Sequence, residues 1–216
     1  MRINKYLALK KISTRRGADE LIKNKKVLIN GKLAILGSRV NETDLVEVKN
    51  TKPKEYLYFA YNKPIGFETN SPKKGLFPLG RLDKNSHGLM ILTNDGRITD
   101  QLLNPKYFHE KEYVVKTKEK LRSNFKQKME AGVNIEGYIT KKCAVKIINE
   151  NTFRVILTEG KKHQIRRMCS NLFQEVADLK RERIMNIKLE SLKSGASREI
   201  KGEELALFLS SMLKPQ

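Results

Sequence analysis

The chain has 216 residues, 39% of them hydrophobic, and a formal net charge of +20 from 44 Lys and Arg against 24 Asp and Glu. This length allows a small domain and a larger one, and so basic a protein is expected to meet a polyanion, either nucleic acid or an anionic membrane surface. No apolar run is long enough to span a bilayer, and the N-terminus lacks the apolar core of a signal peptide. The composition therefore excludes a membrane-spanning protein and predicts a cytoplasmic protein that binds nucleic acid.

Residues 1–50 are predicted to form a separate small domain. Apolar residues at helical spacing predict two helices, the second capped by Ser13, and Asn30-Gly31 predicts a hairpin. Residues 1–55 carry 14 Lys and Arg against 6 Asp and Glu. This excess forms either a solvated basic face or a surface whose cations contact RNA phosphates. The candidates for such contacts are Lys5, Arg15 and Arg16.

Residues 51–56 are polar and include Pro53, which predicts a linker, and residues 57–216 form the predicted second domain. That domain begins with a strand by composition and a turn, Lys63-Pro64-Ile65-Gly66. Turn chemistry alone is sufficient to explain the proline and the glycine. Lys63 is a candidate for contact with an RNA phosphate.

The densest pattern of the chain lies at residues 77–96, FPLGRLDKNSHGLMILTNDG. Arg81 and Asp83 stand two positions apart, and in an extended segment their side chains would lie on the same side. The apolar run that follows suits a buried strand. Asp83 is therefore either a loop carboxylate paired with Arg81 for structure or a preorganised functional carboxylate.

Two later segments carry further candidates. Residues 109–116 predict a strand with Tyr113 and Val115 on one side, where a tyrosine is usually a packing residue. Residues 157–168, LTEGKKHQIRRM, predict a strand end, a glycine turn and a helix start, which would attract phosphate or carboxylate. An ordinary basic helix start that faces RNA is the alternative. Other predicted strands lie at 139–148, 152–157, 175–179 and 184–189, and other helices at 97–103, 121–131 and 203–209.

The cysteines and histidines do not form a readable metal site. Cys143 and Cys169 are far apart, and the three histidines are scattered at 87, 109 and 163. Zinc sites require closely spaced ligand pairs, which this chain lacks. We expect two reduced thiols without function and no metal.

Several of these segments resemble one known family. Residues 80–96 resemble the signature of the RsuA/RluB/RluE/RluF family of ribosomal RNA pseudouridine synthases, which reads Gly-Arg-Leu-Asp, two variable residues, Ser or Thr, one variable residue, Gly-Leu and an apolar run ending in Thr-Asn-Asp-Gly. Residues 111–115 resemble the family's Lys-x-Tyr-x-Val pattern, and 159–168 resemble its Glu-Gly-x-x-x-Gln-Ile-Arg-Arg-Met motif. Residues 139–143 and 181–186 resemble the RluF branch in particular.

The resemblance implies an α+β protein with two domains. The N-terminal residues resemble the alpha-L RNA-binding domain shared with a small-subunit ribosomal protein, and the larger domain would be a pseudouridine synthase domain with a mixed or antiparallel sheet and a central catalytic cleft. The resemblance implies that Asp83 is the catalytic residue, that Tyr113 lies in the active site, and that Arg166 forms an ion pair with Asp83. RNA contacts are expected from Arg81, Lys161 and Arg167.

The function implied is that of an isomerase that converts a specific uridine of RNA to pseudouridine. The target would be flipped out of the helix stack, in a hairpin of large-subunit (23S) ribosomal RNA or in transfer RNA, by a monomer without a cofactor. A non-catalytic protein that binds RNA or the ribosome would explain the charge equally well, but not the three motifs together. A hydrolase or lyase that uses Asp83 on a phosphorylated or sugar substrate would need a partner carboxylate or a metal cluster.

Overall fold

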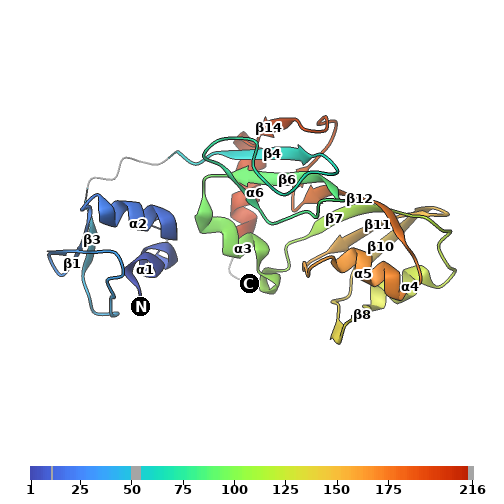
Figure 1. Cartoon of the computed structure of the whole chain (residues 1–216), viewed down its shortest axis with the longest axis horizontal. Coiled ribbons are helices and arrows are strands. Elements are labelled where there is room, and N and C mark those ends of the chain that lie inside the picture. The colour runs from blue at the N-terminus through green and yellow to red at the C-terminus, as the bar shows by residue number, and fades with distance from the viewer. Residues whose placement is uncertain (11, 50–54, 214–216) are drawn as a thin grey trace. The chain divides into compact units, whose positions relative to one another are not determined.

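The computed structural model of the protein describes residues 1–10, 12–49 and 55–213 (Figure 1). The chain divides into two compact units, which are Met1–Tyr56 with Asp95–Ile98, and Leu57–Asn94 with Thr99–Gln216. The predicted linker at 51–56 lies largely outside the described residues, so its limits stay a prediction. Helices and sheets occur in both units, and the predicted α+β class is confirmed.

The first unit pairs two helices with a small antiparallel sheet of strand order β2-β1-β3. Its hairpin turns at Asn30 and Gly31, whose φ angles of 48° and 75° are those of the predicted tight turn. The second helix is capped by Thr14, whose Oγ1 accepts from Gly17 N at 3.0 Å, so the prediction of Ser13 as the cap was wrong by one residue. The elements are α1 (Ile3–Leu9), α2 (Arg15–Lys23), β1 (Val27–Ile29), β2 (Lys32–Leu33) and β3 (Val46–Val48).

The second unit is built on a mixed sheet whose main path runs β10-β11-β7-β12-β6-β4-β14, with β13 beside β12 and β5 beside β6. Every pairing is antiparallel except that of β6 with β12. The strands are β4 (Tyr58–Lys63), β5 (Phe77–Leu79), β6 (His87–Thr93), β7 (Lys111–Thr117), β10 (Ala144–Asn149), β11 (Thr152–Leu157), β12 (Val176–Ile184), β13 (Ile187–Lys188) and β14 (Ser197–Glu199).

Helices and one small hairpin complete this unit. Phe125, Met129, Ile165 and Met168 of α4 and α5 join one buried cluster with residues of β7, β11 and β12. The elements are α3 (Thr99–Leu103), α4 (Phe125–Ala131), α5 (Gln164–Asn171), α6 (Gly202–Leu213), a short 3-10 helix at Pro105–Tyr107, and the hairpin β8 (Asn134–Ile135) with β9 (Tyr138–Ile139). A further 3-10 helix, Gly96–Ile98, lies in the segment that groups with the first unit.

Two strand predictions were wrong. The strand predicted at 139–148 is divided, because Tyr138–Ile139 pairs with β8 and a new strand begins at Ala144. The strands predicted at 175–179 and 184–189 are instead one long strand, β12, and the short β13. The basic residues between them stay in the sheet because their side chains find hydrogen-bond acceptors there. Arg183 Nε lies 2.7 Å from Glu112, and Arg181 Nε donates to the Leu89 carbonyl at 2.7 Å.

The parallel pairing of β6 with β12 is short and close. It joins only Lys180 to His87 and Arg181 to Gly88. Gly88 has a φ of 103°, and a Cβ there would collide with the carbonyl oxygen of Arg181 and lie 2.8 Å from its nitrogen. The sheet therefore requires glycine at this position, which is the glycine of the Gly-Leu pair in the motif.

Gly88→Ala is expected to destabilise the second unit by about 2–5 kcal/mol, since it combines backbone strain with a steric overlap against β12. Gly137→Ala is the matched control, because Gly137 also has a positive φ, 84°, but no atom lies within 4 Å of its Cβ position. Urea unfolding of both variants, followed by far-UV circular dichroism, measures the difference. Equal losses for the two variants would contradict the close approach of β6 and β12.

Candidate active site

Asp83 lies in the loop between β5 and β6, and the backbone of this loop is held from several sides. Thr69 Oγ1 accepts from Leu82 N at 3.1 Å and donates to the Leu82 carbonyl at 2.5 Å. Ser86 N donates to the Asp83 carbonyl at 2.9 Å, and Gly66 N donates to the Lys84 carbonyl at 2.8 Å. The carboxylate is thus carried by a fixed loop, yet its side chain keeps 38% of its surface exposed, so a substrate can reach it.

Two basic side chains are close to Asp83, and neither is the predicted partner. His163 Nε2 lies 3.3 Å from Asp83 Oδ1. Lys63 is buried, with 1% of its surface exposed, and its ammonium donates to the carbonyls of Pro64 at 2.9 Å and Phe67 at 2.6 Å. Burial lowers the pKa of Lys63, and the nearby charge of Asp83 raises it. The expectation that Lys63 contacts an RNA phosphate was wrong, because its ammonium is bound to carbonyls inside its own turn.

Arg166 holds the loop of Asp83 rather than the carboxylate. Its Nη2 donates to the Asn85 carbonyl at 2.7 Å and to Ser86 Oγ at 3.3 Å, and its Nη1 donates to the Val176 carbonyl at 3.3 Å. Within the described residues no ion pair joins Asp83 to Arg166 or to Arg81. The predicted Arg166–Asp83 pair is therefore wrong for this structure, because the guanidinium is engaged by backbone oxygens. Arg166 still fixes the segment that carries Asp83.

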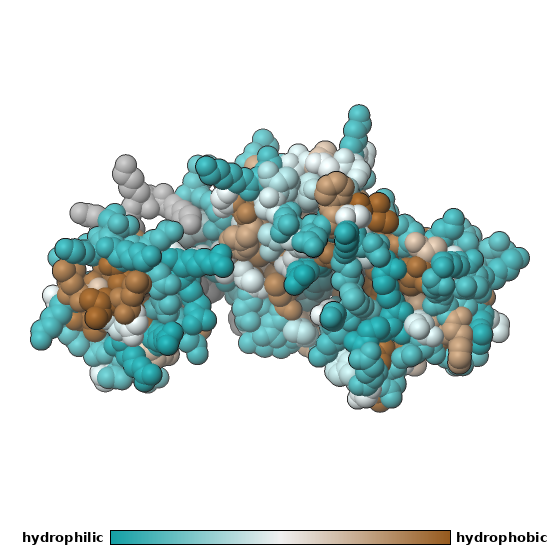
Figure 2. Space-filling view, viewed as in Figure 1, coloured by the Kyte–Doolittle hydropathy of each residue, from teal (hydrophilic) through white to brown (hydrophobic). Residues whose placement is uncertain are grey.

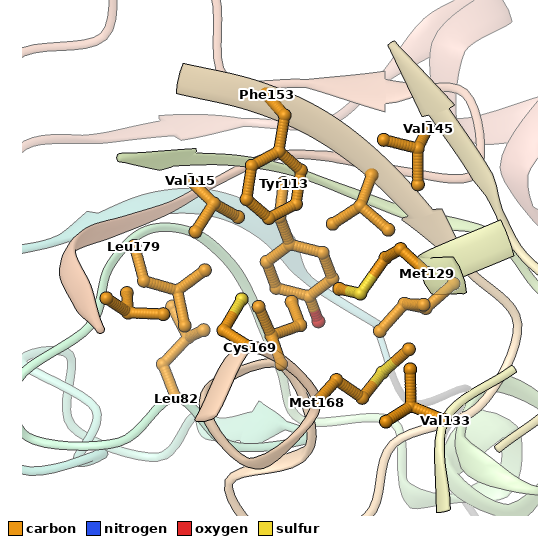
Figure 3. Close-up of a cluster of buried hydrophobic side chains, with 14 of the residues drawn as sticks. Leu82, Tyr113, Val115, Met129, Val133, Val145, Phe153, Met168, Cys169 and Leu179 are labelled. Carbon is orange, nitrogen blue, oxygen red and sulfur yellow. The ribbon is translucent and has the colours of Figure 1, made fainter. Parts of the chain in front are cut away.

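Tyr113 lies in the buried cluster beside this loop (Figure 3). Its ring is surrounded by Leu82, Met168 and Leu179, so the residue that precedes Asp83 packs in the same cluster as Tyr113. The pairing registers place Lys63, Gly88, Arg181 and Tyr113 opposite one another on successive strands β4, β6, β12 and β7. The sheet thereby brings together residues that are between 25 and 118 positions apart in the sequence.

The segment before α5 is organised by Glu159, which is 2% exposed. Its carboxylate accepts from Tyr138 Oη at 2.6 Å, Lys141 N at 3.0 Å and Gln164 Nε2 at 2.7 Å. This network ties the β8–β9 hairpin to the start of α5, where His163 adopts a left-handed conformation with a φ of 53°. The Glu and Gln of the third motif thus position His163 and Arg166, a role that the sequence did not reveal.

The remaining predicted RNA contacts lie at the surface, where hydrophilic residues dominate the visible face (Figure 2). Arg167 differs from them, because it is half-buried and forms an ion pair with Glu136 at 2.5 Å. His87, a variable position of the motif, bonds to Asp178 at 2.9 Å. The exposed residues are Lys5, Arg15, Arg16, Arg81 and Lys161.

Sequence reasoning missed a group of buried basic residues near Tyr113. Arg181 is 3% exposed, and its Nη2 has no hydrogen-bond partner among the described residues. Burial, and to a lesser extent the charge of Arg181, lower the pKa of Lys111 to about 8. Burial and Lys111 also lower the pKa of His109. The alternation of β7, which places Lys111 on the side of Tyr113, was the signal that could have identified Lys111.

The thiols are unreactive, as the sequence predicts. Burial raises the pKa of Cys143 to about 11 and that of Cys169 to about 12, so both stay protonated near neutral pH. The described residues contain no group of three or more His, Cys, Asp and Glu side chains that could hold a metal ion. They also contain no helix that is long and apolar enough to cross a membrane.

Comparisons with known proteins identify the family of both parts of the chain. Residues 60–171 match the family model described as RNA pseudouridylate synthase, and residues 1–46 match the S4 domain. The chain is 38% identical to the dual-specificity RNA pseudouridine synthase RluF of Escherichia coli (strain K12), over 95% of this chain and 77% of that protein. It is 33% identical to the ribosomal large subunit pseudouridine synthase B of Bacillus subtilis (strain 168), over 94% of this chain and 93% of that protein.

A solved structure supports the same comparison. A crystal structure described as pseudouridylate synthase superposes with a TM-score of 0.72 at 27% sequence identity, and the match covers 99% of this chain and 100% of that chain. The likeness therefore extends over both units of the chain.

Lys111→Met is expected to change how stability depends on pH. The folded state holds the Lys111 proton only up to a pKa of about 8, whereas the unfolded chain holds it up to about 10.4. Between these values the unfolded state binds more protons, so the stability of the wild type rises with pH through this window. In the variant the free energy of unfolding lacks this rise, which amounts to on the order of 2–3 kcal/mol. Urea unfolding at pH 7, 8, 9 and 10 measures it.

The control for this series is Lys116→Met, an exposed position on the same strand. Lys116→Met should change the free energy of unfolding by the same amount at every pH. A constant difference between Lys111→Met and the wild type would contradict the buried, proton-poor state of Lys111.

Proposed function

Because the chain belongs to the RNA pseudouridylate synthase family and carries an S4 domain, we propose that it isomerises a uridine in a hairpin of large-subunit ribosomal RNA, with Asp83 as the catalytic carboxylate. The family's reaction converts uridine to pseudouridine in RNA. The observation that carries the assignment to Asp83 is the position of its exposed carboxylate, on a braced loop beside the Tyr113 cluster. Transfer RNA is the second substrate that we include.

The reaction breaks the bond from the ribose C1′ to uracil N1 and forms a bond from C1′ to uracil C5, while the proton on C5 is lost and N1 gains one. Atoms and electrons balance within the substrate, so the proposed reaction uses no cofactor. The target base must leave the helix stack to be turned, which is base flipping. Asp83 would act at C1′ as the N1 bond breaks, as nucleophile or as the negative charge that stabilises the electron-poor sugar.

The other residues of the site have supporting roles in the proposal. Tyr113 would lie under the uracil ring and supply a hydroxyl that can exchange a proton. Arg166 is a positioning residue, since its guanidinium braces Asn85 and Ser86 two and three residues after Asp83. His163 Nε2 lies 3.3 Å from Asp83 Oδ1, within reach to orient the carboxylate, and Lys63 lies close enough for the charge of Asp83 to raise its pKa.

Binding of the RNA around the target is assigned to exposed cations. Lys5, Arg15 and Arg16 lie on or beside the helices of the first unit, and Arg81 and Lys161 lie in segments adjoining Asp83 and α5. Arg167 contributes if its ion pair with Glu136 opens. A structured RNA of this kind is recognised by shape and phosphate contacts more than by sequence.

The site residues Asp83, Tyr113 and Arg166 all come from one chain, so we propose a monomer as the active form. Ribosomal RNA as the substrate favours the cytoplasm as the place of action.

Asp83→Asn is expected to abolish pseudouridine formation while RNA binding persists, because the amide keeps the shape of the side chain and removes its charge and nucleophilicity. Wild type and variant are incubated with large-subunit ribosomal RNA and with transfer RNA, and pseudouridine is mapped by chemical tagging and primer extension. Asp100→Asn, an exposed carboxylate on α3, is the control and should keep full activity. Binding without modification by the wild type on both RNAs would overturn the proposed function.

Arg166→Lys is expected to lower kcat by about 100-fold with little change in RNA affinity, because an ammonium cannot replace a guanidinium that bonds Asn85 and Ser86 at once. Arg198→Lys is the control, since Arg198 makes a two-pronged pair with Glu204 at 2.6 and 2.7 Å but has no contact with this loop. Single-turnover rates and filter binding separate the two quantities. An unchanged kcat for Arg166→Lys would remove Arg166 from the site.

A further inference from the structure

A cavity lies beside the loop of Asp83, where α5 ends and β12 begins. Its volume is about 430 Å³, and Arg166, Phe173 and Gln174 contribute to its wall. The proposed reaction gives this cavity no role. Arg166 connects it to the active site, because the same guanidinium that lines the cavity donates to the carbonyl of Asn85.

Phe173 is held in a conformation that favours glycine. It follows Leu172, the C-cap of α5, and has a left-handed φ of 59°. Glycine is the usual residue at this point, because a side chain there strains the backbone. The phenyl ring is nevertheless 72% exposed, so burial of the ring does not offset the strain. A strained, exposed aromatic ring at the rim of a cavity suggests a binding role.

A guanidinium completes the flat surface at this rim. The Arg122 Cζ atom lies 4.8 Å from the centre of the Phe173 ring. Aromatic rings beside arginine are typical stacking surfaces for unpaired nucleic-acid bases, since every base offers a flat face.

The polar groups in the cavity wall favour a ligand that offers hydrogen-bond donors. Gln174 is 3% exposed, and its Nε2 donates to the Lys120 carbonyl at 3.3 Å. Its Oε1 is buried and has no hydrogen-bond partner among the described residues. Buried acceptors are normally paired, so this oxygen favours a ligand that donates. Glu119 and Glu175 also line the cavity, and their carboxylates disfavour phosphate.

We propose that this cavity binds an unpaired base with an amino group, from the RNA that is being modified. The base stacks on Phe173, and the Gln174 side chain rotates within the wall so that its Oε1, buried and unpaired in the free protein, accepts a hydrogen of the amino group. Adenine carries such an amino group, whereas uracil carries none. The inference rests on the proposed function, since it assigns a neighbouring nucleotide of the same substrate, and Arg166 links the occupied cavity to the loop of Asp83.

The test uses short RNA oligomers, which need not be modified. Fluorescence anisotropy measures the Kd of two ten-nucleotide RNAs, one of adenosine alone and one of uridine alone, at a single fixed salt concentration because binding to phosphates depends on salt. The variants are Phe173→Gly, Phe173→Trp and Gln174→Met. Phe108→Gly is the matched control, because Phe108 is also exposed, has a φ of 54° and lies 3.8 Å from the ammonium of Lys141.

Phe173→Gly should weaken binding of the adenosine oligomer by about 5- to 100-fold, the range for loss of one stacked base, and change the uridine oligomer far less. The same variant should unfold at a higher temperature than the wild type, since glycine removes the backbone strain, and this separates lost binding from misfolding. Phe173→Trp should keep the affinity. Gln174→Met should reduce the preference for adenosine by about two- to tenfold.

Equal losses for both oligomers, or a loss of the same size in Phe108→Gly, would overturn the base site and leave a general surface contact. No loss in Phe173→Gly would also overturn it and favour a protein partner for this surface. The outcome is independent of the proposed function. If the wild type modifies no RNA, and Phe173→Gly still weakens binding of the adenosine oligomer, the synthase assignment is wrong and the base site is supported.

Discussion

The candidate active site depends on the short parallel contact between β6 and β12. This contact joins β4, β6 and β14 to β7, β10 and β11, and it consists of two residue pairs. Side chains support it at both ends, where His87 bonds to Asp178 at 2.9 Å and Arg181 bonds to the Leu89 carbonyl at 2.7 Å. Because Gly88 lacks a side chain, the backbones of β6 and β12 can approach closely. The loop of Asp83 leads into β6, and β12 lies next to β7, the strand that carries Tyr113.

The same contact explains why the site needs buried arginine and lysine. Parallel pairing ends after Gly88, and the Leu89 carbonyl then receives its hydrogen bond from the side chain of Arg181 instead of a strand. Lys63 has a comparable structural role in the turn that follows β4, where its ammonium donates to two backbone carbonyls. These cations act first as structural donors. Of the two, Lys63 also lies close enough to Asp83 for the charge of that carboxylate to raise its pKa.

The sequence predicted what local chemistry determines and missed what depends on distant partners. The Asn30-Gly31 turn and the alternation of β7 follow from local rules, and both are confirmed. The continuity of β12 could not be predicted, because its charged residues are tolerated only through Glu112 and Leu89, which lie elsewhere in the chain. Motif likeness brought Asp83, Tyr113 and Arg166 together, and the structure places them around one loop and one cluster.

Likeness to the third motif predicted a direct pair between Arg166 and Asp83, and the structure shows a different contact for Arg166. A guanidinium near a carboxylate is expected to pair with it, yet Arg166 has three backbone or hydroxyl acceptors within reach. Bonds to the loop fix the position of Asp83 without burying its charge, and the carboxylate stays 38% exposed. A carboxylate that must meet a sugar carbon benefits from this arrangement, since a direct pair with the Arg166 guanidinium would have to be broken before it could react. Orientation of Asp83 through the bonds of Arg166 to the loop therefore suits the proposed chemistry better than the predicted direct pair would.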